Sequence, residues 1–256
     1  MRKRDRFAAG AGALFGGFAW VPDLAALATG AVFECLRPLT WRRTARDEFR
    51  RWLDIAAREP LVAVLAIGAL IGLGLVLQAI ELLRQFGQEA LVREVVIVLL
   101  IEQIAPVAVG LLVIGRTGLL LFEEIAASRR SGELAALEAM GADPFLVEIA
   151  PRLAAISIAA FAHFTLLAAT TLIVGYGAAK VSGAPIGSLA FAIDEALGAV
   201  GGAGLALAGF KSWAIGLLVG AAFALTAMEP RPRLTAAFLR AFVAMLAAGV
   251  TLTVLA

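Results

Sequence analysis

The run LVAVLAIGALIGLGLVLQAIELL fills residues 61–83, and its first charged residue is Glu81. An α-helix needs about 20 apolar residues to cross the roughly 30 Å hydrocarbon core of a bilayer. Pro60 stands directly before the run, where the missing backbone N–H of a proline costs least. The run therefore predicts a transmembrane helix. Four later runs are long enough to predict the same: residues 95–114, 153–179, 207–227 and 236–256.

The composition of the chain agrees with this interpretation. Of its 256 residues, 61% are hydrophobic and 16% are charged, whereas a soluble domain is usually about 45–50% apolar. Open strands in lipid would leave backbone groups unsatisfied, and the ten-residue alternation of an outer-membrane barrel is absent. We predict an all-α, polytopic helical membrane protein with about five transmembrane helices and an N-terminal interfacial or re-entrant helix.

The N-terminal apolar segment, residues 7–33, is rich in Gly and Ala and is interrupted at Pro22. Three interpretations stay open. A signal peptide would explain the basic start and the small-residue site at residues 26–28. A sixth span would put the first cations on the side opposite the arginines of residues 42–51, which the positive-inside rule disfavours. An interfacial or re-entrant helix would explain the interruption at Pro22, and we favour this third interpretation.

Residues 41–56 have the pattern of an amphipathic helix. Apolar residues recur at three- and four-residue spacing and arginines fill the other side, as in helices that lie on an anionic membrane surface. The alternative is a soluble helix packed on a partner. Residues 1–58 thus form a basic, amphipathic N-terminal region. The apolar positions are Trp41, Ala45, Phe49, Trp52 and Ala56, and the basic ones are Arg42, Arg43, Arg46 and Arg50.

The cations also predict the orientation of the spans. Half of the Lys and Arg residues precede residue 60, and others flank residues 115–152 and 228–235, whereas the loops near 84–94 and 180–206 have few. Cytoplasmic loops of membrane proteins are enriched in Lys and Arg. Five spans then place the N-terminus and residues 115–152 in the cytoplasm and the C-terminus outside.

Residues 115–152 are the longest polar segment between the spans. Glu123 to Met140 is compatible with a helix, which Gly141 can end. Asp143 and Pro144 can begin the next helix as its cap and first-turn proline. We expect one or two short helices across the cytoplasmic face, with an apolar stripe suited to a partner's groove.

Few polar residues lie within the predicted spans. Glu102 and Gln103 fall in the second span and are followed by Pro106, which removes a helix hydrogen bond. An ionisable group at this depth normally faces a cavity or a partner, so a position lining a substrate path or gate is one interpretation. A polar pair that joins helices is the other. His163 is either a proton relay or a hydrogen bond to a neighbouring helix.

The chain lacks the residue patterns that several kinds of chemistry require. The single cysteine, Cys35, allows no internal disulfide and no cysteine cluster for a metal. Lys211-Ser212 follows Phe210 where a phosphate-binding loop requires Gly. We therefore expect no metal, no cofactor, no nucleic-acid partner and no enzymatic activity, and any ATP hydrolysis must come from another subunit.

Short motifs follow one another from the second span to the start of the third. They are Gln103-Ile104-Ala105-Pro106, Gly115-Arg116-Thr117-Gly118, Glu124-Ile125, Gly132-Glu133, Met140-Gly141-Ala142-Asp143-Pro144 and Pro151-Arg152, with Leu77-Gln78 and Lys211-Ser212 outside the block. In this order and spacing they resemble the MlaE/YrbE family of lipid-transport ABC permeases. The family has Glu and Gly where Gln103 and Ala105 stand, and a Glu-Gln pair at residues 132–133, so the chain resembles a divergent member.

The resemblance implies that residues 1–256 form a single MlaE-like permease domain of five spans that works as a homo- or heterodimer in the bacterial inner membrane. It implies an ATPase at the coupling loop, residues 115–152, an MCE-type lipid-binding protein on the outer side, and phospholipid or another hydrophobic lipid as cargo. The expected coupling residues are Glu124, Glu133, Leu134, Leu137, Glu138, Met140, Gly141, Asp143, Pro144 and Arg152. The expected cavity or gate residues are Leu77, Gln78, Glu102, Gln103 and Pro106.

Two other function classes stay open. An ion-coupled secondary transporter would use Glu102 or His163 and would work without any ATPase. A permease-like scaffold without transport would form the complex yet tolerate changes at Glu102 and Gln103.

Overall fold

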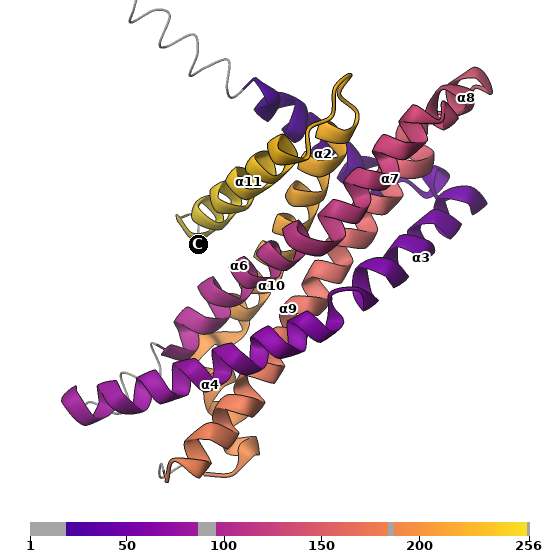
Figure 1. The fold of residues 1–256 in the computed structure, drawn as a ribbon. Coiled ribbons are helices and arrows are strands. Elements are labelled where there is room, and N and C mark those ends of the chain that lie inside the picture. The colour runs from indigo at the N-terminus through magenta and orange to yellow at the C-terminus, as the bar shows by residue number, and fades with distance from the viewer. Residues whose placement is uncertain (1–18, 87–95, 184–186, 255–256) are drawn as a thin grey trace, which may run out of the picture.

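The computed structural model describes residues 19–86, 96–183 and 187–254, which fold into helices joined by short turns (Figure 1). Within these residues there is no strand, and five helices are long and apolar enough to cross a membrane. The prediction of an all-α polytopic membrane protein is confirmed. The five are Arg43–Gln78, Val96–Arg130, Phe145–Val181, Leu189–Ala227 and Leu234–Val254.

Helix α2 (Trp20–Leu36) crosses the bundle at one of its ends (Figure 1). Near its start, the Arg240 guanidinium lies 5.8 Å from the Trp20 ring centroid. Near its end, the Cys35 thiol donates to the Ala150 carbonyl at 3.7 Å. The helix thus lies across the helix ends, as an interfacial helix does, and is not one of the five spans. The basic start of the signal-peptide interpretation lies outside the described residues.

Helix α3 (Arg43–Arg58) carries the amphipathic pattern of residues 41–56, and its apolar side faces the other helices of the chain. It runs on in roughly the direction of α4 (Leu61–Phe86) after a turn at Glu59 and Pro60 (Figure 1). Its apolar side buries Ala45, Trp52 and Ala56 within the chain itself. The reason is that α9 (Ala150–Val181) extends far enough to cover this side.

Glycines bring α4 and α9 into close contact. A Cβ on Gly72 would lie 2.4 Å from the Thr171 carbonyl oxygen, and one on Gly68 would lie 3.1 Å from that of Leu167. In return, the Thr171 hydroxyl donates to the Gly68 carbonyl at 3.0 Å. The small-xxx-small pattern of Gly68 and Gly72 therefore marks a helix contact, as such patterns do in membranes.

The second span continues well past its predicted end. After π-turn η2 (Leu100–Ile104) come α6 (Ala105–Leu112), π-turn η3 (Val113–Thr117) and α7 (Gly118–Arg130). Residues 115–130 are thus a helix that extends the span, not part of a loop. A Cβ on Gly118 would meet the Phe223 ring at 2.5 Å. Packing therefore favours a glycine at this position, although glycine has a low helix propensity. The expected helices lying across the face are replaced by α7 and the short α8 (Glu133–Ala139) at its tip.

The fourth span also begins earlier than predicted. Helix α10 (Leu189–Ala227) starts where the Ser188 hydroxyl accepts from the Phe191 N–H at 3.2 Å. It is kinked at Gly201, whose φ of 69° is one that side-chain-bearing residues rarely adopt. The loop expected at 180–206 is therefore mostly helix, and the loop near 84–94 falls largely outside the described residues. Helix α11 (Leu234–Val254) forms the last span.

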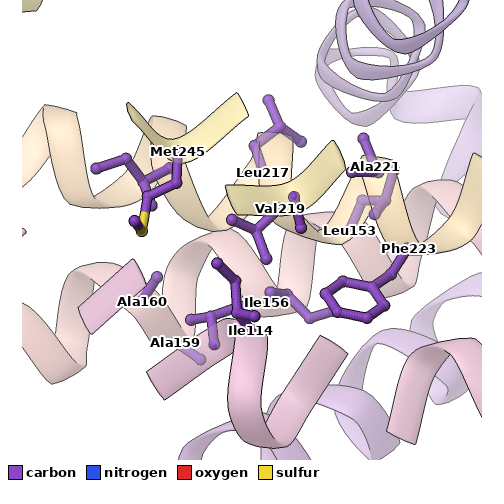
Figure 2. Packing of buried hydrophobic residues seen from close by; sticks show 14 of the residues in the cluster. Ile114, Leu153, Ile156, Ala159, Ala160, Leu217, Val219, Ala221, Phe223 and Met245 are labelled. Atoms are coloured by element: carbon purple, nitrogen blue, oxygen red, sulfur yellow. The ribbon is translucent and has the colours of Figure 1, made fainter. Parts of the chain in front are cut away.

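The core lies where α9 and α10 meet, and side chains from α7, η3 and α11 close it (Figure 2). A Cβ on Gly216 would lie 2.6 Å from the Ala160 Cβ, so the two helices touch along small residues. Larger side chains such as Leu153, Ile156 and Phe223 are fully buried on either side of this line. The core thus fixes α9, which carries residues of the site below.

Candidate functional site

Helix α8 forms the tip of a helical hairpin made by α7 and by the α9 rod that returns through π-turn η4 (Phe145–Ile149) (Figure 1). Gly132 and Gly141 bound it with φ of 79° and 76°. The Ala142 N–H donates to the Leu137 carbonyl at 3.0 Å, which is the glycine-ended C-cap that the sequence indicates. The Asp143 carboxylate then accepts from the Phe145 N–H at 2.9 Å, so Asp143 caps the return helix as predicted.

The tip contacts little of its own chain. None of the residues of α8 is buried, and Met140 is 73% exposed. Leu134 and Leu137 are half-buried, while Glu133, Glu138, Gly141 and Asp143 are exposed. Most of the expected coupling residues, including the half-buried Pro144, are therefore brought together on one protruding surface. The end of the bundle that carries it is called the α8 end below.

Two expected coupling residues lie below the tip, in a charge cluster. The Arg152 guanidinium reaches Glu148 at 3.0 Å, Glu48 at 2.6 Å and Glu124 at 3.7 Å. Arg51 also pairs with Glu48, at 2.7 Å, and with Glu124. The cluster thus joins α3, α7, η4 and α9 where the hairpin leaves the bundle.

Arg152 is the buried centre of this cluster. Its side chain is 4% exposed, and those of Glu148 and Glu48 are 10% and 17% exposed. The guanidinium also lies 5.7 Å from the ring centroid of the buried Trp52. Charges at this depth are tolerated when they are paired and hydrogen-bonded, and removal of one partner is strongly destabilising. These ion pairs therefore connect the base of the hairpin to α3 and α9.

Three residues of this cluster, Glu48, Arg51 and Glu148, were not predicted, although their spacing in the sequence indicates ion pairs. Glu148 and Arg152 stand four apart on one helix, which is the spacing of a helical ion pair. Glu48 and Arg51 stand three apart beside the apolar positions of α3. Their link to Arg152 spans about a hundred residues of sequence, so only the fold shows it.

A second polar group lies within the spans, around Glu102. Pro106 has no N–H, so the Glu102 carbonyl four residues earlier loses its helical partner. The Lys211 ammonium, on a side chain that is almost completely buried, lies 3.4 Å from this carbonyl and donates to the Thr253 hydroxyl at 3.0 Å. Thr253 in turn lies 3.2 Å from the Gln103 amide oxygen. This cluster joins two of the predicted gate residues, Glu102 and Gln103, to α10 and α11.

The other predicted polar positions lie apart from it. Leu77 and Gln78 are exposed on α4, and no described contact joins them to Glu102. The His163 Nε2 lies 3.1 Å from the Ala57 carbonyl of α3, so the ring bonds a neighbouring helix. Lys211 itself was recognised in the sequence only as part of a motif match. In the described part of the chain, no group of His, Cys, Asp and Glu is placed to hold a metal ion.

The chemistry of Cys35 yields one prediction. Burial, and next the Glu34 carboxylate, raise the pKa of the Cys35 thiol to about 11. At pH 8 about one such thiol in a thousand is ionised, against roughly a quarter for an ordinary cysteine. We expect N-ethylmaleimide to label the folded protein on the order of a hundredfold more slowly than the detergent-unfolded chain, with a rate that still rises from pH 8 to 10. Equal rates in both states would contradict the raised pKa of this half-buried thiol.

Comparison with known proteins identifies the family. The family model described as Permease MlaE matches residues 51–255. The chain belongs to the MlaE permease family. One relative of this permease, from Haemophilus influenzae (strain ATCC 51907 / DSM 11121 / KW20 / Rd), is named "Intermembrane phospholipid transport system permease protein MlaE" and is 35% identical over 100 residues. The match covers 39% of the permease described here and 38% of the relative, so it spans about two fifths of each chain.

Proposed function

We propose that the chain is the membrane subunit of an ABC transporter, in which a separate ATPase binds at α8 and drives the movement of phospholipid or another hydrophobic lipid. Membership of a permease family and five spanning helices support a transporter role and not an enzymatic one. The name of the relative supports phospholipid as the cargo class. The observation that carries the coupling proposal is the exposed α8 tip, held on the spans by the Arg152 cluster.

The position of α8 suits a coupling element. A partner that grips the tip moves α7 and the start of α9 together, because Arg152 and Glu124 join the two sides of the hairpin. The second span then transmits the movement toward Glu102, which lies on the same helical rod, Val96–Arg130. Glu102, Gln103 and Pro106 are the proposed gate. For Leu77 and Gln78, exposed on α4, a role at the cavity stays a prediction.

The proposed setting is a bacterial inner membrane with the α8 end in the cytoplasm. The arginines of α3, together with Arg129, Arg130 and Arg152, gather at this end, as the positive-inside rule requires. The N-terminus is then cytoplasmic and the C-terminus lies on the outer side. A second permease chain, equal or different, would complete a cavity for a two-tailed lipid, and an MCE-type protein would exchange the lipid on the outer side.

Native mass spectrometry of the tagged protein, gently extracted from its own host, tests the proposal. We expect a nucleotide-binding subunit, a second permease chain and masses of phospholipid size to accompany it. A permease that is recovered alone, without an ATPase and without lipid, would overturn the proposal.

Charge reversal at the tip tests the docking surface. We expect Glu138→Lys to lower the ATPase recovered with the purified permease by about tenfold or more, because a like charge placed in an interface costs several kcal/mol. Asp143→Ala should lower it less, since it removes the cap of the return helix. Asp194→Lys, on an exposed residue at the opposite end of the bundle, is the matched control. Unchanged co-purification of both tip variants would count against α8 as the docking site.

One observation favours a second candidate, a gradient-driven carrier. Lys211 is a buried cation that lies beside Glu102 within the spans, and ionisable groups at this depth often mark ion pathways. Such a carrier predicts transport that follows an imposed proton or sodium gradient without ATPase. Transport into ATPase-free vesicles decides between the two.

A further inference from the structure

A pocket of about 530 Å³ opens at the α8 end, away from both the tip and the Glu102 cluster. It lies where the end of α2 meets α3, α9 and α10. A pocket of this size is in the range of small-molecule sites. Its walls divide into a cationic side on α3 and an apolar side on the spans.

The cationic side consists of Arg46 and Arg50, one helical turn apart and both exposed. Arg46 is held in place because its Nε donates to the Trp41 carbonyl at 2.7 Å, which leaves its terminal amino groups available. Among the described residues, Arg50 has no hydrogen bond or ion pair. The neighbouring Arg51, in contrast, is fully engaged by Glu48. No Asp or Glu lines the pocket, so its two guanidiniums face no counter-charge there.

The apolar side is built for hydrocarbon. Ile158 of α9 and Trp213 and Leu217 of α10 line it, and Ile158 is 45% exposed. Trp41 and Phe49, in edge-to-face contact with centroids 5.1 Å apart, also line the pocket. Aromatic rings at the boundary of a polar and an apolar zone are typical of the membrane interface.

We propose that this pocket binds an anionic phospholipid from the leaflet at the α8 end. Its phosphate pairs with Arg46 and Arg50, because guanidinium groups match phosphate oxygens in charge and geometry. Its acyl chains lie on Ile158, Trp213 and Leu217. A soluble phosphate would use the arginines alone and leave the apolar side without a ligand. The site is distinct from the proposed cargo path through Glu102, and it would hold a resident lipid that ties α2 and α3 to the bundle.

Native mass spectrometry of the delipidated permease, without nucleotide, tests the site. Phosphatidylglycerol, phosphatidylcholine and glycerol 3-phosphate are added in separate titrations. We expect phosphatidylglycerol to bind at several-fold lower concentration than phosphatidylcholine, and glycerol 3-phosphate not to bind. The double variant Arg46→Gln/Arg50→Gln should weaken phosphatidylglycerol binding by about tenfold. Arg50→Gln alone breaks no contact within the described chain and should weaken this binding by about threefold.

The double variant Arg42→Gln/Arg43→Gln is the matched control. It removes the same charge from the start of α3, but neither residue lines the pocket. An equal loss in both double variants would assign the effect to general surface charge and overturn the proposal. Equal binding of glycerol 3-phosphate would assign the arginines to a soluble phosphate and overturn it as well. Because no ATPase or transport is measured, failure here leaves the proposed transport function standing.

Brominated phosphatidylglycerol gives an independent readout of the apolar side. Bromine on the acyl chains quenches nearby tryptophan, and Trp41 and Trp213 line the pocket whereas Trp20 and Trp52 do not. We expect saturable quenching that falls by about half in Trp213→Phe, where Trp41 remains in the pocket, and that needs higher lipid concentrations in Arg50→Gln. Quenching that is unchanged in both variants would contradict an acyl chain at this place.

Discussion

Arg152→Ala is expected to give the largest loss of stability among the polar substitutions. The change leaves the buried Glu148 carboxylate without its cation and removes one of the two cations that pair with the half-buried Glu48. Removal of one partner from a buried ion pair costs about 3–5 kcal/mol. By the scaling of soluble domains of similar size, this corresponds to a fall of roughly 10 °C in the midpoint of thermal unfolding. Size-exclusion chromatography of the detergent-solubilised permease after heating measures it.

Two further variants show whether the loss comes from unbalanced charge. In Glu148→Gln/Arg152→Met, one negative charge leaves together with the cation, and Arg51 still pairs with Glu48 and Glu124. We expect this double variant to recover part of the midpoint. Arg58→Ala is the surface control, because Arg58 and Asp54 pair at 2.7 Å with side chains 79% and 56% exposed. Such pairs contribute about 0–1 kcal/mol. Equal losses for Arg152→Ala and Arg58→Ala would contradict a buried cluster.

A third substitution at Arg152 bears on the proposed coupling. If the cluster transmits movement from α8 to the spans, Arg152→Met should retain bound ATPase yet lose most lipid transport. Glu138→Lys should instead lose the ATPase itself. This pair of results separates a residue that transmits movement from one that forms the docking surface. Loss of ATPase binding in both variants would mean that the cluster only holds the tip in its folded position.

Local chemistry made the end of α8 and the start of the return helix predictable from the sequence. Gly141 and Asp143 act through contacts within a few residues, so each could be placed without the fold. The five spans were predictable for a similar reason, since their length and apolar character are set by the bilayer alone. The end of the second span was not, because the polar segment that begins at Gly115 predicts a loop. Packing of Phe223 against Gly118 decides otherwise, and that contact joins positions a hundred residues apart.

The residues of the candidate site also differ in whether local sequence could predict them. The exposed residues of α8 were found because an amphipathic polar segment is visible in sequence. The role of Glu48 was not, since its partner Arg152 lies on another helix. Lys211 shows the same limit within the spans. Pro106 indicates that the Glu102 carbonyl lacks a helical donor, but only the fold shows that Lys211 takes this place.

Gly72→Leu is the second substitution with a large expected effect. Even a Cβ at this position would lie 2.4 Å from the Thr171 carbonyl oxygen and 3.1 Å from the Gly175 backbone nitrogen. Both neighbours are backbone atoms of α9, which cannot rotate away, so α4 must separate from α9 to admit a side chain. In a membrane, contacts between close-packed small residues are a main source of helix association. We expect poor recovery of folded permease and a thermal midpoint about 10 °C or more below that of the wild type, since overpacking by one group alone costs about 1–3 kcal/mol.

Alanine substitutions at two glycines of α4 provide the matched comparison. A Cβ on Gly74 meets nothing within 4 Å, so Gly74→Ala gains the helix propensity of alanine, about 1 kcal/mol, without a clash. Gly72→Ala gains the same propensity but must push Thr171 aside. Both variants add one methyl group to α4 and change no charge. The difference between their thermal midpoints therefore measures the α4–α9 contact. If Gly72→Ala is as stable as Gly74→Ala, the backbones of α4 and α9 are not in contact, and the close packing of these two helices is wrong.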